Sequence, residues 1–565
     1  MATALETASL VMVPSGYEDG TLGSLQPLDG TGDFTFTRGS NISATRVNED
    51  GYIEKGYENL LLRSNTFDTT WASVRVSEST GFAGYDGADN AWKIVPNTQL
   101  GDHRLDQSTS VSGVWTFNIY AKAAGYNFLY ILFSGIGNSG KVIDISPNQG
   151  VVVDNKGGVQ AIDESITDVG NNWWKITLTY SGTLGTLRII TLPANDTSSY
   201  AGDGTSGILI QDAQLNQGLV AYPYLETTTT TAKGGILENM PRLDYSGGRC
   251  SLLLEPSRTN LSTNSEYTSV SNGAITYNDA ISPEGIQNAI KITATSAAFP
   301  RFYNTTTFGG GNTYIVSFYV KKGVGDGVGL YGYSNVNYNN VVRFNLDTNE
   351  VTYLQTAFSN GYIEDAGNGW KRCVATLTTP STGSWSGINA VINKANFLQA
   401  EVGDEHYFYG MQVEQDATYP TSYIPTYGVS QTKLADNATA SSVIDAGDDF
   451  TLYFESTRMD YGFTGVYFQA TNFGYLSGYT ISNTNLRFRY SNVNYGFTAS
   501  EGVFKYLIRK DSTDMRIYFN GALEYTITTL PAGIGNLNLS GGKIHKTMVF
   551  PTALSDEVCI ELTTI

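Results

Sequence analysis

Short segments in which apolar and polar residues alternate recur along the whole chain. In residues 116–122, Phe117, Ile119 and Ala121 alternate with more polar residues, and this period of two places successive side chains on opposite faces of a β-strand. Residues 315–321 repeat the pattern. The pattern predicts short strands, and the Gly, Asn and Ser residues between them predict turns.

Two long stretches of the chain carry the same landmarks in the same order. Each opens on an Asn-Leu pair, at Asn59 and Asn260, and continues through an alternating strand to a Gly/Asn turn that ends in tryptophan, at 168–173 and 365–370. Landmarks that keep their order and spacing indicate an internal duplication. We expect two modules with one fold.

The rest of the chain divides around these modules. Its last part has closely spaced strands, a hairpin turn at Asn520-Gly521 and a helix start within 553–557, which predict a two-sheet sandwich and a short helix. The expected parts are an N-terminal attachment segment with a hairpin (1–57), the first module (58–231), a linker or framework segment (232–251), the second module (252–432) and the last sandwich (433–565).

Composition supports an all-β protein and excludes several classes. The 565 residues include 61 Gly, 37 Tyr and 25 Phe, only 15% are charged, and the net charge is −19. An acidic chain does not offer the basic face that nucleic acid requires. Three distant cysteines provide neither a disulfide framework nor a CxxC metal clip. We expect no secretory signal, because the first residues lack a basic region, and no membrane insertion, because apolar runs are short.

Several motifs carry a family resemblance. Residues 14–54, with 241–266, resemble the recurring framework of tailed-bacteriophage structural proteins that display carbohydrate-binding modules. The duplicated modules are similar to jelly rolls of carbohydrate-binding families four and nine, through the Asn-Leu opening and the Gly-Asn-Gly-Trp turn at 367–370. Residues 433–565 resemble a concanavalin-like (laminin-G-like) lectin sandwich through 515–524 and 550–559. The resemblance implies tandem jelly-roll sandwiches followed by a concanavalin-like sandwich.

The chain departs from this framework at one place. In the usual arrangement the segment ending at 54 runs almost directly into 241–261, whereas here a whole module lies between them. The first module therefore resembles an insertion by duplication. We expect residues 51–57 and 236–245 to pack together in spite of it.

Aromatic and amide side chains are the candidates for ligand binding, because sugars bind flat aromatic surfaces while amides and carboxylates reach their hydroxyls. A second interpretation stays open, in which these aromatics fill a core or a subunit contact. Trp173 and Trp370, at matched positions of the duplication, are interpreted as core residues. The candidate glycan-binding residues are Trp71, Tyr85, Trp92 and Tyr126 in the first module, and Tyr331, Tyr333, Asn335, Asn337 and Tyr338 in the second.

Catalytic and metal chemistry find little support. Glycosidases need two facing carboxylates, and the acidic pairs at 163–164, 364–365 and 401–405 lie in turn-like segments. His103, His406 and His545 are too scattered for a catalytic triad or a histidine metal site. We expect no enzyme activity and no cofactor. The resemblance implies a structural calcium ion in such modules, but no DxDxD cluster marks one.

These observations predict a virion structural protein, a head or tail appendage or fibre, that adheres to glycans of the host surface or the environment. The resemblance implies assembly in the host cytoplasm, display on the particle exterior and attachment to other virion proteins through the N-terminal segment. A homo-oligomer would raise avidity, and the trimer is the commonest form of viral fibres. The alternatives are capsid decoration or tail assembly without glycan binding, a polysaccharide depolymerase, and a secreted bacterial lectin.

Overall fold

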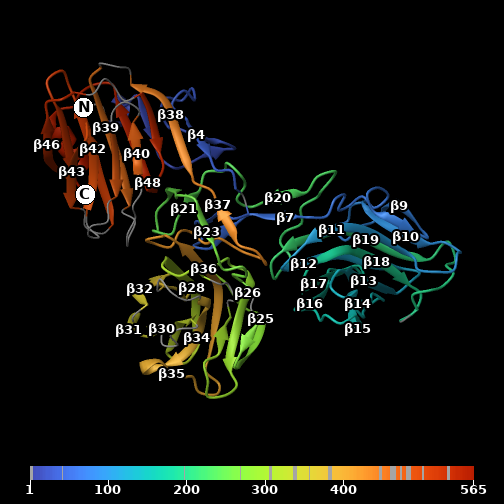
Figure 1. Cartoon of the computed structure of the whole chain (residues 1–565). Helices are drawn as coiled ribbons and strands as arrows, with labels where there is room; N and C mark the ends of the chain where they lie inside the picture. The colour runs from blue at the N-terminus through green and yellow to red at the C-terminus, as the bar shows by residue number, and fades with distance from the viewer. Residues whose placement is uncertain are drawn as a thin grey trace.

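The fold is all-β, as predicted, and is built from sandwiches of antiparallel sheets (Figure 1). The computed structural model describes residues 4–565 apart from 41, 196, 267–268, 304–307, 335–339, 356, 380–384, 445–447, 458–465, 471–473, 479–484, 499–501 and 531–534. Helix α1 (Ala4–Thr7) is one turn long, and α2 (Asp556–Thr563) is the predicted C-terminal helix. The Ser555 hydroxyl caps α2 by accepting a hydrogen bond from the Val558 amide.

The first module is a sandwich of two sheets. On β12, Phe117, Ile119 and Ala121 are fully buried and face the core, as their alternation predicts. One sheet contains, in order, β16 (Asp163–Asp168), β17 (Trp174–Ser181), β12 (Val114–Ala124), β19 (Gly207–Gln217), β10 (Ala91–Pro96) and β9 (Val76–Phe82). The other contains β15 (Val151–Lys156), β14 (Ser139–Asp144), β13 (Phe128–Ser134), β18 (Leu184–Leu192), β11 (Arg104–Val111) and β8 (Ala72–Val74).

The second module has the same two-sheet design, with a core that includes Val316, Phe318 and Val320 of β28. One sheet contains β25 (Gly273–Ile281), β26 (Gln287–Ala294), β36 (Glu405–Gln415), β28 (Thr313–Val324), β33 (Trp370–Thr378) and β32 (Phe358–Asp365). The other contains β24 (Val270–Ser271), β27 (Arg301–Phe302), β34 (Trp385–Lys394), β29 (Gly327–Ser334), β30 (Asn340–Asn345) and β31 (Glu350–Leu354), with β35 (Leu398–Gln399) beside β34 and the 3-10 turn η1 (Ala395–Phe397) between them.

The landmarks of the duplication make the same contacts in both modules. The Asn59 amide donates to the carbonyls of Ala213 and Leu225, and the Asn260 amide donates to those of Met411 and Ile424. Each asparagine thus joins the last long strand of its module to the segment that leaves it. Trp173 and Trp370 are both 1% exposed, which confirms them as core residues.

The C-terminal sandwich includes strands from the first residues of the chain, and both chain ends lie in it (Figure 1). Its core combines Leu10, Met12 and Phe34 with Leu252 and Phe454. One sheet contains β21 (Leu243–Asp244), β22 (Ser251–Leu254), β48 (Gly542–Phe550), β39 (Phe450–Thr457), β44 (Val503–Lys510), β45 (Met515–Phe519) and β46 (Ala522–Ile527), with β1 (Leu10–Met12) beside β48. The other contains β2 (Tyr17–Glu18), β3 (Thr21–Leu22), β4 (Phe34–Thr37), β38 (Asn437–Ile444), β47 (Gly535–Leu539), β40 (Val466–Ala470), β41 (Gly474–Gly478), β42 (Asn485–Tyr490) and β43 (Val493–Thr498).

The framework segments meet across the inserted module, at or beside the ranges 51–57 and 236–245 that were expected to pack together. The hairpin of β5 (Thr45–Val47) and β6 (Ile53–Lys55) lies against β21, and the Val47 amide donates to the Asp244 carboxylate at 2.9 Å. Further along, β7 (Tyr57–Asn59) pairs with β20 (Ala232–Gly234). A pairing of the same length joins β23 (Arg258–Asn260) to β37 (Gln431–Lys433), at the entry and exit of the second module.

Candidate functional site

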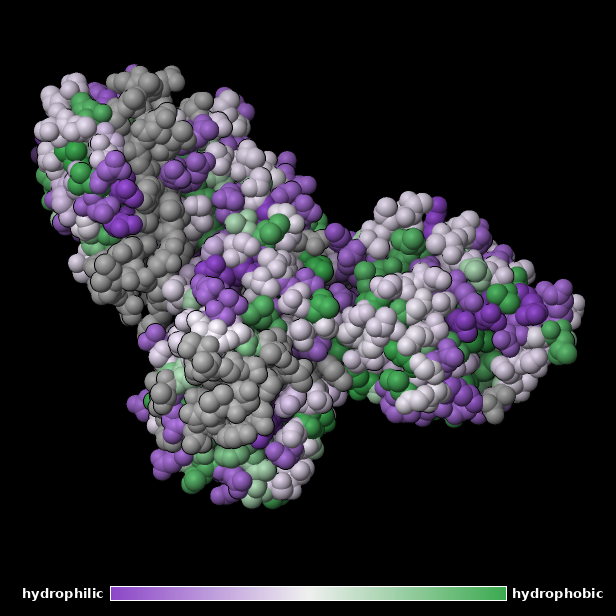
Figure 2. Space-filling model, viewed as in Figure 1, coloured by the Kyte–Doolittle hydropathy of each residue, from purple (hydrophilic) through white to green (hydrophobic). Residues whose placement is uncertain are grey.

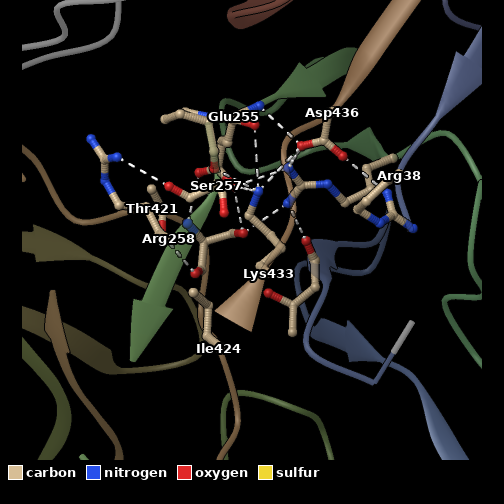
Figure 3. A network of polar contacts seen from close by, with 12 residues as sticks. Arg38, Glu255, Ser257, Arg258, Thr421, Ile424, Lys433 and Asp436 are labelled. Carbon is tan, nitrogen blue, oxygen red and sulfur yellow. Dashed lines mark hydrogen bonds and ion pairs between the residues drawn. The ribbon is translucent and has the colours of Figure 1, made fainter. Parts of the chain in front are cut away.

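A buried network of charged side chains joins the framework segments (Figure 3). Asp436 pairs with Arg38 at 3.1 Å, with Lys433 at 3.4 Å and with Arg242. Glu255 pairs with the same Arg242 at 3.0 Å. All five side chains are at most 2% exposed, and they come from segments before the first module, between the modules, at the start of the second module and after it. The network therefore fixes the C-terminal sandwich to the framework.

The charges of this network favour ionised carboxylates. Burial opposes ionisation of Asp436, but the positive charges of Arg242, Lys433 and Arg38 outweigh it and hold the pKa of Asp436 well below its ordinary 3.8. Burial likewise opposes ionisation of Glu255, yet Arg242 and Lys433 keep its pKa below 4.5. Carboxylates this tightly paired are structural groups.

We therefore expect the protein to lose stability in acid. Because the folded-state pKa values of Asp436 and Glu255 are depressed, their stabilisation is present above about pH 4.5 and is lost as pH falls below it. Each proton taken up on unfolding lowers stability by about 1.4 kcal/mol per pH unit. Urea unfolding at pH 7, 5, 4 and 3 would measure the slope, and the Asp436→Asn variant should show a shallower one. An equal slope in both proteins would contradict this assignment.

A second buried cluster joins the two modules through the framework. The Lys55 ammonium lies 2.6 Å from Glu266 Oε1 and also pairs with Glu284, and all three side chains are at most 4% exposed. Tyr423 donates its hydroxyl to Glu266 at 3.0 Å, and Tyr222 of the first module donates to Glu284 at 3.1 Å. The lysine of β6 thus enters an acidic, tyrosine-lined site on the second module.

A cleft of about 530 Å³ opens between the framework hairpin, the second module and the C-terminal sandwich. Its volume is within the range of small-ligand sites. Five tyrosines line it: Tyr245, Tyr319, Tyr362, Tyr419 and Tyr423. Tyr319, Tyr419 and Tyr423 are buried and shape the wall, whereas Tyr245 and Tyr362 are partly exposed. The two partly exposed rings are the aromatic surfaces that a ligand in the cleft can contact.

Polar groups of both signs surround these tyrosines. Arg372 is buried with its guanidinium 5.4 Å from the centre of the Tyr319 ring, and its Nη2 donates to the carbonyl of Thr421 at 2.8 Å. Lys543 of the C-terminal sandwich donates to the hydroxyl of Ser246 at 2.6 Å. The partly exposed Glu364 and the exposed Asp365 also line the cleft. These groups can hydrogen-bond a ligand that is rich in hydroxyls.

The candidate residues of the first module do not form one site. Trp71 is 3% exposed and Trp92 is 8% exposed, and both rings pack around Phe67 in the core. Tyr85 stacks on the ring of Tyr120 with 3.7 Å between centroids, and its hydroxyl donates to Asp212 at 2.8 Å. Burial of the two tryptophans favours the packing role that the sequence left open.

The remaining candidates are separated from these. Tyr126 is partly exposed and contacts the edge of the Tyr200 ring. In the second module, Tyr331 is partly exposed on β29, beneath the guanidinium of Arg301 at 5.2 Å. The side chain of Tyr333, together with Asn335, Asn337 and Tyr338, lies outside the described residues. Ligand binding by Tyr85, Tyr126 and the candidates of the second module stays a prediction.

The acidic and histidine candidates have structural partners. Glu164 pairs with Lys141 at 2.6 Å, and Asp404 pairs with Lys394 at 3.1 Å. The His103 ring lies 2.7 Å from the carbonyl of Arg75 and 2.9 Å from that of Tyr200. Within the described ranges, no group of three or more His, Cys, Asp or Glu side chains could hold a metal ion. No residues are therefore assigned to the calcium ion that the family resemblance implies.

Sequence reasoning missed the cleft, because its walls come from seven separate stretches of the chain, none of which carries a binding motif by itself. The signal that could have found it was in the framework motifs. Arg38, Arg242 and Glu255 lie in these motifs, and they meet Asp436 at the junction that contains the cleft. Glu255 directly follows three leucines, and a charged residue beside such an apolar run indicates paired burial.

No protein-family model matches this chain, and no curated protein sequence matches it. Among solved structures, the chain is similar to domain 4 of AbnA, a GH43 extracellular arabinanase from Geobacillus stearothermophilus, in complex with arabinotriose (14% identity, 23% of this chain and 73% of that chain, TM-score 0.19). It is also similar to the CBM40 of the Ruminococcus gnavus IT-sialidase bound to α2,3-sialyllactose (16%, 22% and 87%, TM-score 0.18) and to the Trypanosoma rangeli sialidase in complex with the inhibitor DANA (9%, 87% and 98%, TM-score 0.19). Likenesses with such TM-scores carry no argument about this chain.

Among the described residues, no helix is both long and apolar enough to cross a membrane.

The visible described surface of the first module mixes polar and apolar residues (Figure 2).

Proposed function

We propose that this protein is a non-enzymatic structural component of a phage particle that binds glycans in the cleft between its framework, second module and C-terminal sandwich. The observation that carries the binding proposal is the cleft itself, with a volume of about 530 Å³ and the partly exposed Tyr245 and Tyr362 on its walls. Aromatic faces beside carboxylate, hydroxyl and ammonium groups fit a saccharide.

The virion role rests on the framework motifs, in which Arg38, Arg242 and Glu255 join separate parts of the chain. Attachment to other virion proteins would use the exposed part of the N-terminal segment, which includes Leu25 and Leu28 at 49% and 92% exposure. The particle exterior, assembly in the host cytoplasm and a homo-oligomer, with the trimer as the expected form, belong to the same proposal. Cross-linking of purified particles with mass spectrometry would locate residues 4–37 against their neighbours, and cross-links confined to this chain would contradict the attachment.

We expect the Tyr362→Ala variant to bind glycan about tenfold more weakly, which corresponds to about 1.4 kcal/mol, because the cleft loses one of its two accessible rings. The whole chain would first be applied to an array of bacterial surface glycans, and the strongest hit titrated by calorimetry. Tyr303→Ala is the matched control, since Tyr303 is 40% exposed on the same module outside the cleft. Equal loss in both variants would contradict binding in the cleft, and no array signal would favour a purely structural role.

A depolymerase is the second candidate, because the carboxylates of Asp244, Glu364 and Asp365 all line the cleft. Loss of viscosity of a capsular polysaccharide solution, abolished by Glu364→Gln, would establish it. Unchanged viscosity together with glycan binding would favour the adhesion role. Asp244 already accepts hydrogen bonds from the amides of Val47 and Ser246, which favours a structural role for that carboxylate.

A further inference from the structure

An asparagine in the second module is buried without a hydrogen-bonding partner. Asn393 lies near the end of β34 and is 1% exposed, and within the described ranges neither its Oδ1 nor its Nδ2 has a partner. Burying an unpaired amide costs free energy that folding does not recover. Such a group calls for an explanation, and one explanation is a partner that arrives later.

Glycines on the neighbouring strand leave room for the Asn393 amide. Asn393 pairs with Gly327 across β34 and β29. A Cβ atom on Gly329 would lie 2.6 Å from Asn393 Nδ2 and 2.7 Å from Phe397 Cε2, too close for any side chain. A Cβ atom on Gly327 would lie 2.5 Å from Nη2 of the buried Arg343. On the outer face of this sheet, Asn393 and Arg343 thus form a polar spot beside Gly327 and Gly329.

Phe397 covers the spot in an unfavourable backbone conformation. It has φ of 57°, and the preceding Asn396 has φ of 56° and ψ of 26°. Phenylalanine rarely adopts the left-handed region, because its Cβ crowds the backbone. The ring stacks on Phe299 with 5.4 Å between centroids, and the adjacent Leu398 is 62% exposed. A strained, surface-lying turn thus closes over an unpaired amide.

We propose that residues 395–399 are a lid, and that Phe397 moves aside to admit a saccharide whose neighbouring hydroxyls pair with the Asn393 amide. An amide offers two N–H donors and one carbonyl acceptor in one plane, which matches two adjacent hydroxyl groups. Opening relaxes Asn396 and Phe397, and binding satisfies Asn393. This inference rests on the proposed glycan-binding function but concerns a second site, on the sheet face remote from the module core.

Two variants test the lid. Asn393→Leu keeps the branched shape of the side chain and removes the unpaired amide, so the melting transition of the whole chain should rise by about 2–4 °C. Phe397→Ala removes the cover, so the strongest saccharide from the bacterial glycan array should bind at least fivefold more tightly, because the closed state no longer competes. In the double variant, which combines Asn393→Leu with Phe397→Ala, this gain in saccharide affinity should disappear.

The outcomes separate this inference from the proposed function. The melting shift of Asn393→Leu needs no ligand, so a lower melting temperature would overturn the lid even if the cleft binds glycan. Unchanged affinity in Phe397→Ala would also overturn it. Tyr362→Ala in the Phe397→Ala background should weaken the cleft site and leave the gain at the lid. Absence of glycan binding by every variant would overturn both proposals, whereas loss confined to Tyr362→Ala would support the cleft alone.

Discussion

Replacing Asp436 by Asn is expected to lower the free energy of unfolding of the C-terminal sandwich by about 3–5 kcal/mol. The variant keeps the shape of the side chain but leaves the buried Arg38, Arg242 and Lys433 with Glu255 as the remaining carboxylate of the network. An uncompensated buried charge is far more costly than the loss of one hydrogen bond. Equilibrium denaturation followed by tyrosine fluorescence would measure the loss.

The matched control is Asp347→Asn. Asp347 is 51% exposed and pairs with Lys322, which is 39% exposed, and exposed pairs contribute about 0–1 kcal/mol. If both variants lose less than about 1 kcal/mol, the network does not hold the sandwich to the framework. Arg38→Met in the Asp436→Asn background should cost less than it does alone, because the two side chains interact directly.

Replacing Lys55 by Met is expected to separate the first module from the second and to cost about 3–5 kcal/mol. The variant keeps the aliphatic stem but leaves Glu266 and Glu284 buried without the ammonium that they share. Burial and the neighbouring Glu266 raise the pKa of Glu284 above 4.5, so protonation relieves part of the repulsion. The loss should therefore be smaller at pH 5 than at pH 8.

Limited proteolysis of the 232–251 segment and small-angle scattering would report the separation. Lys233→Met is the control, since Lys233 is exposed on β20, close to the same junction. A Lys55→Met protein with unchanged dimensions and unchanged unfolding would contradict the role of this lysine. A larger loss of stability on Lys55→Met at pH 5 than at pH 8 would contradict the charge argument.

The sequence predicted correctly those features that depend on residues close together in the chain. Alternation on 116–122 predicted an inward-facing strand, and the repeated Asn-Leu openings predicted two modules in which Asn59 and Asn260 make the same contacts. These patterns succeed because a strand's period and a turn's residues are fixed by neighbouring atoms. The meeting of the hairpin with β21 was also predicted, because its motifs were recognised as two halves of one framework.

The sequence was uninformative where contacts join distant segments. Nothing in residues 10–12 indicates that they pair with residues 547–549, since many exposed strand edges could accept them. The burial of Lys55 on β6 was equally hard to predict, because a lysine between Glu54 and Gly56 is typical of a solvated position until its acidic partners are placed. Trp71 and Trp92 show the same limit for the candidate site, because a large ring suits a core and a sugar equally well.

The pairing of β1 with β48 has a consequence for synthesis of the protein. Leu10 lies opposite Val549, so the pairing of β1 with β48 cannot form until almost all of the intervening chain has left the ribosome. At ribosomal rates of about 5–20 residues per second this wait is roughly half a minute to two minutes. A chain truncated before residue 542 leaves the apolar Leu10, Met12 and Leu252 without β48. Translation products that end before β48 would thus expose these residues to chaperones and proteases.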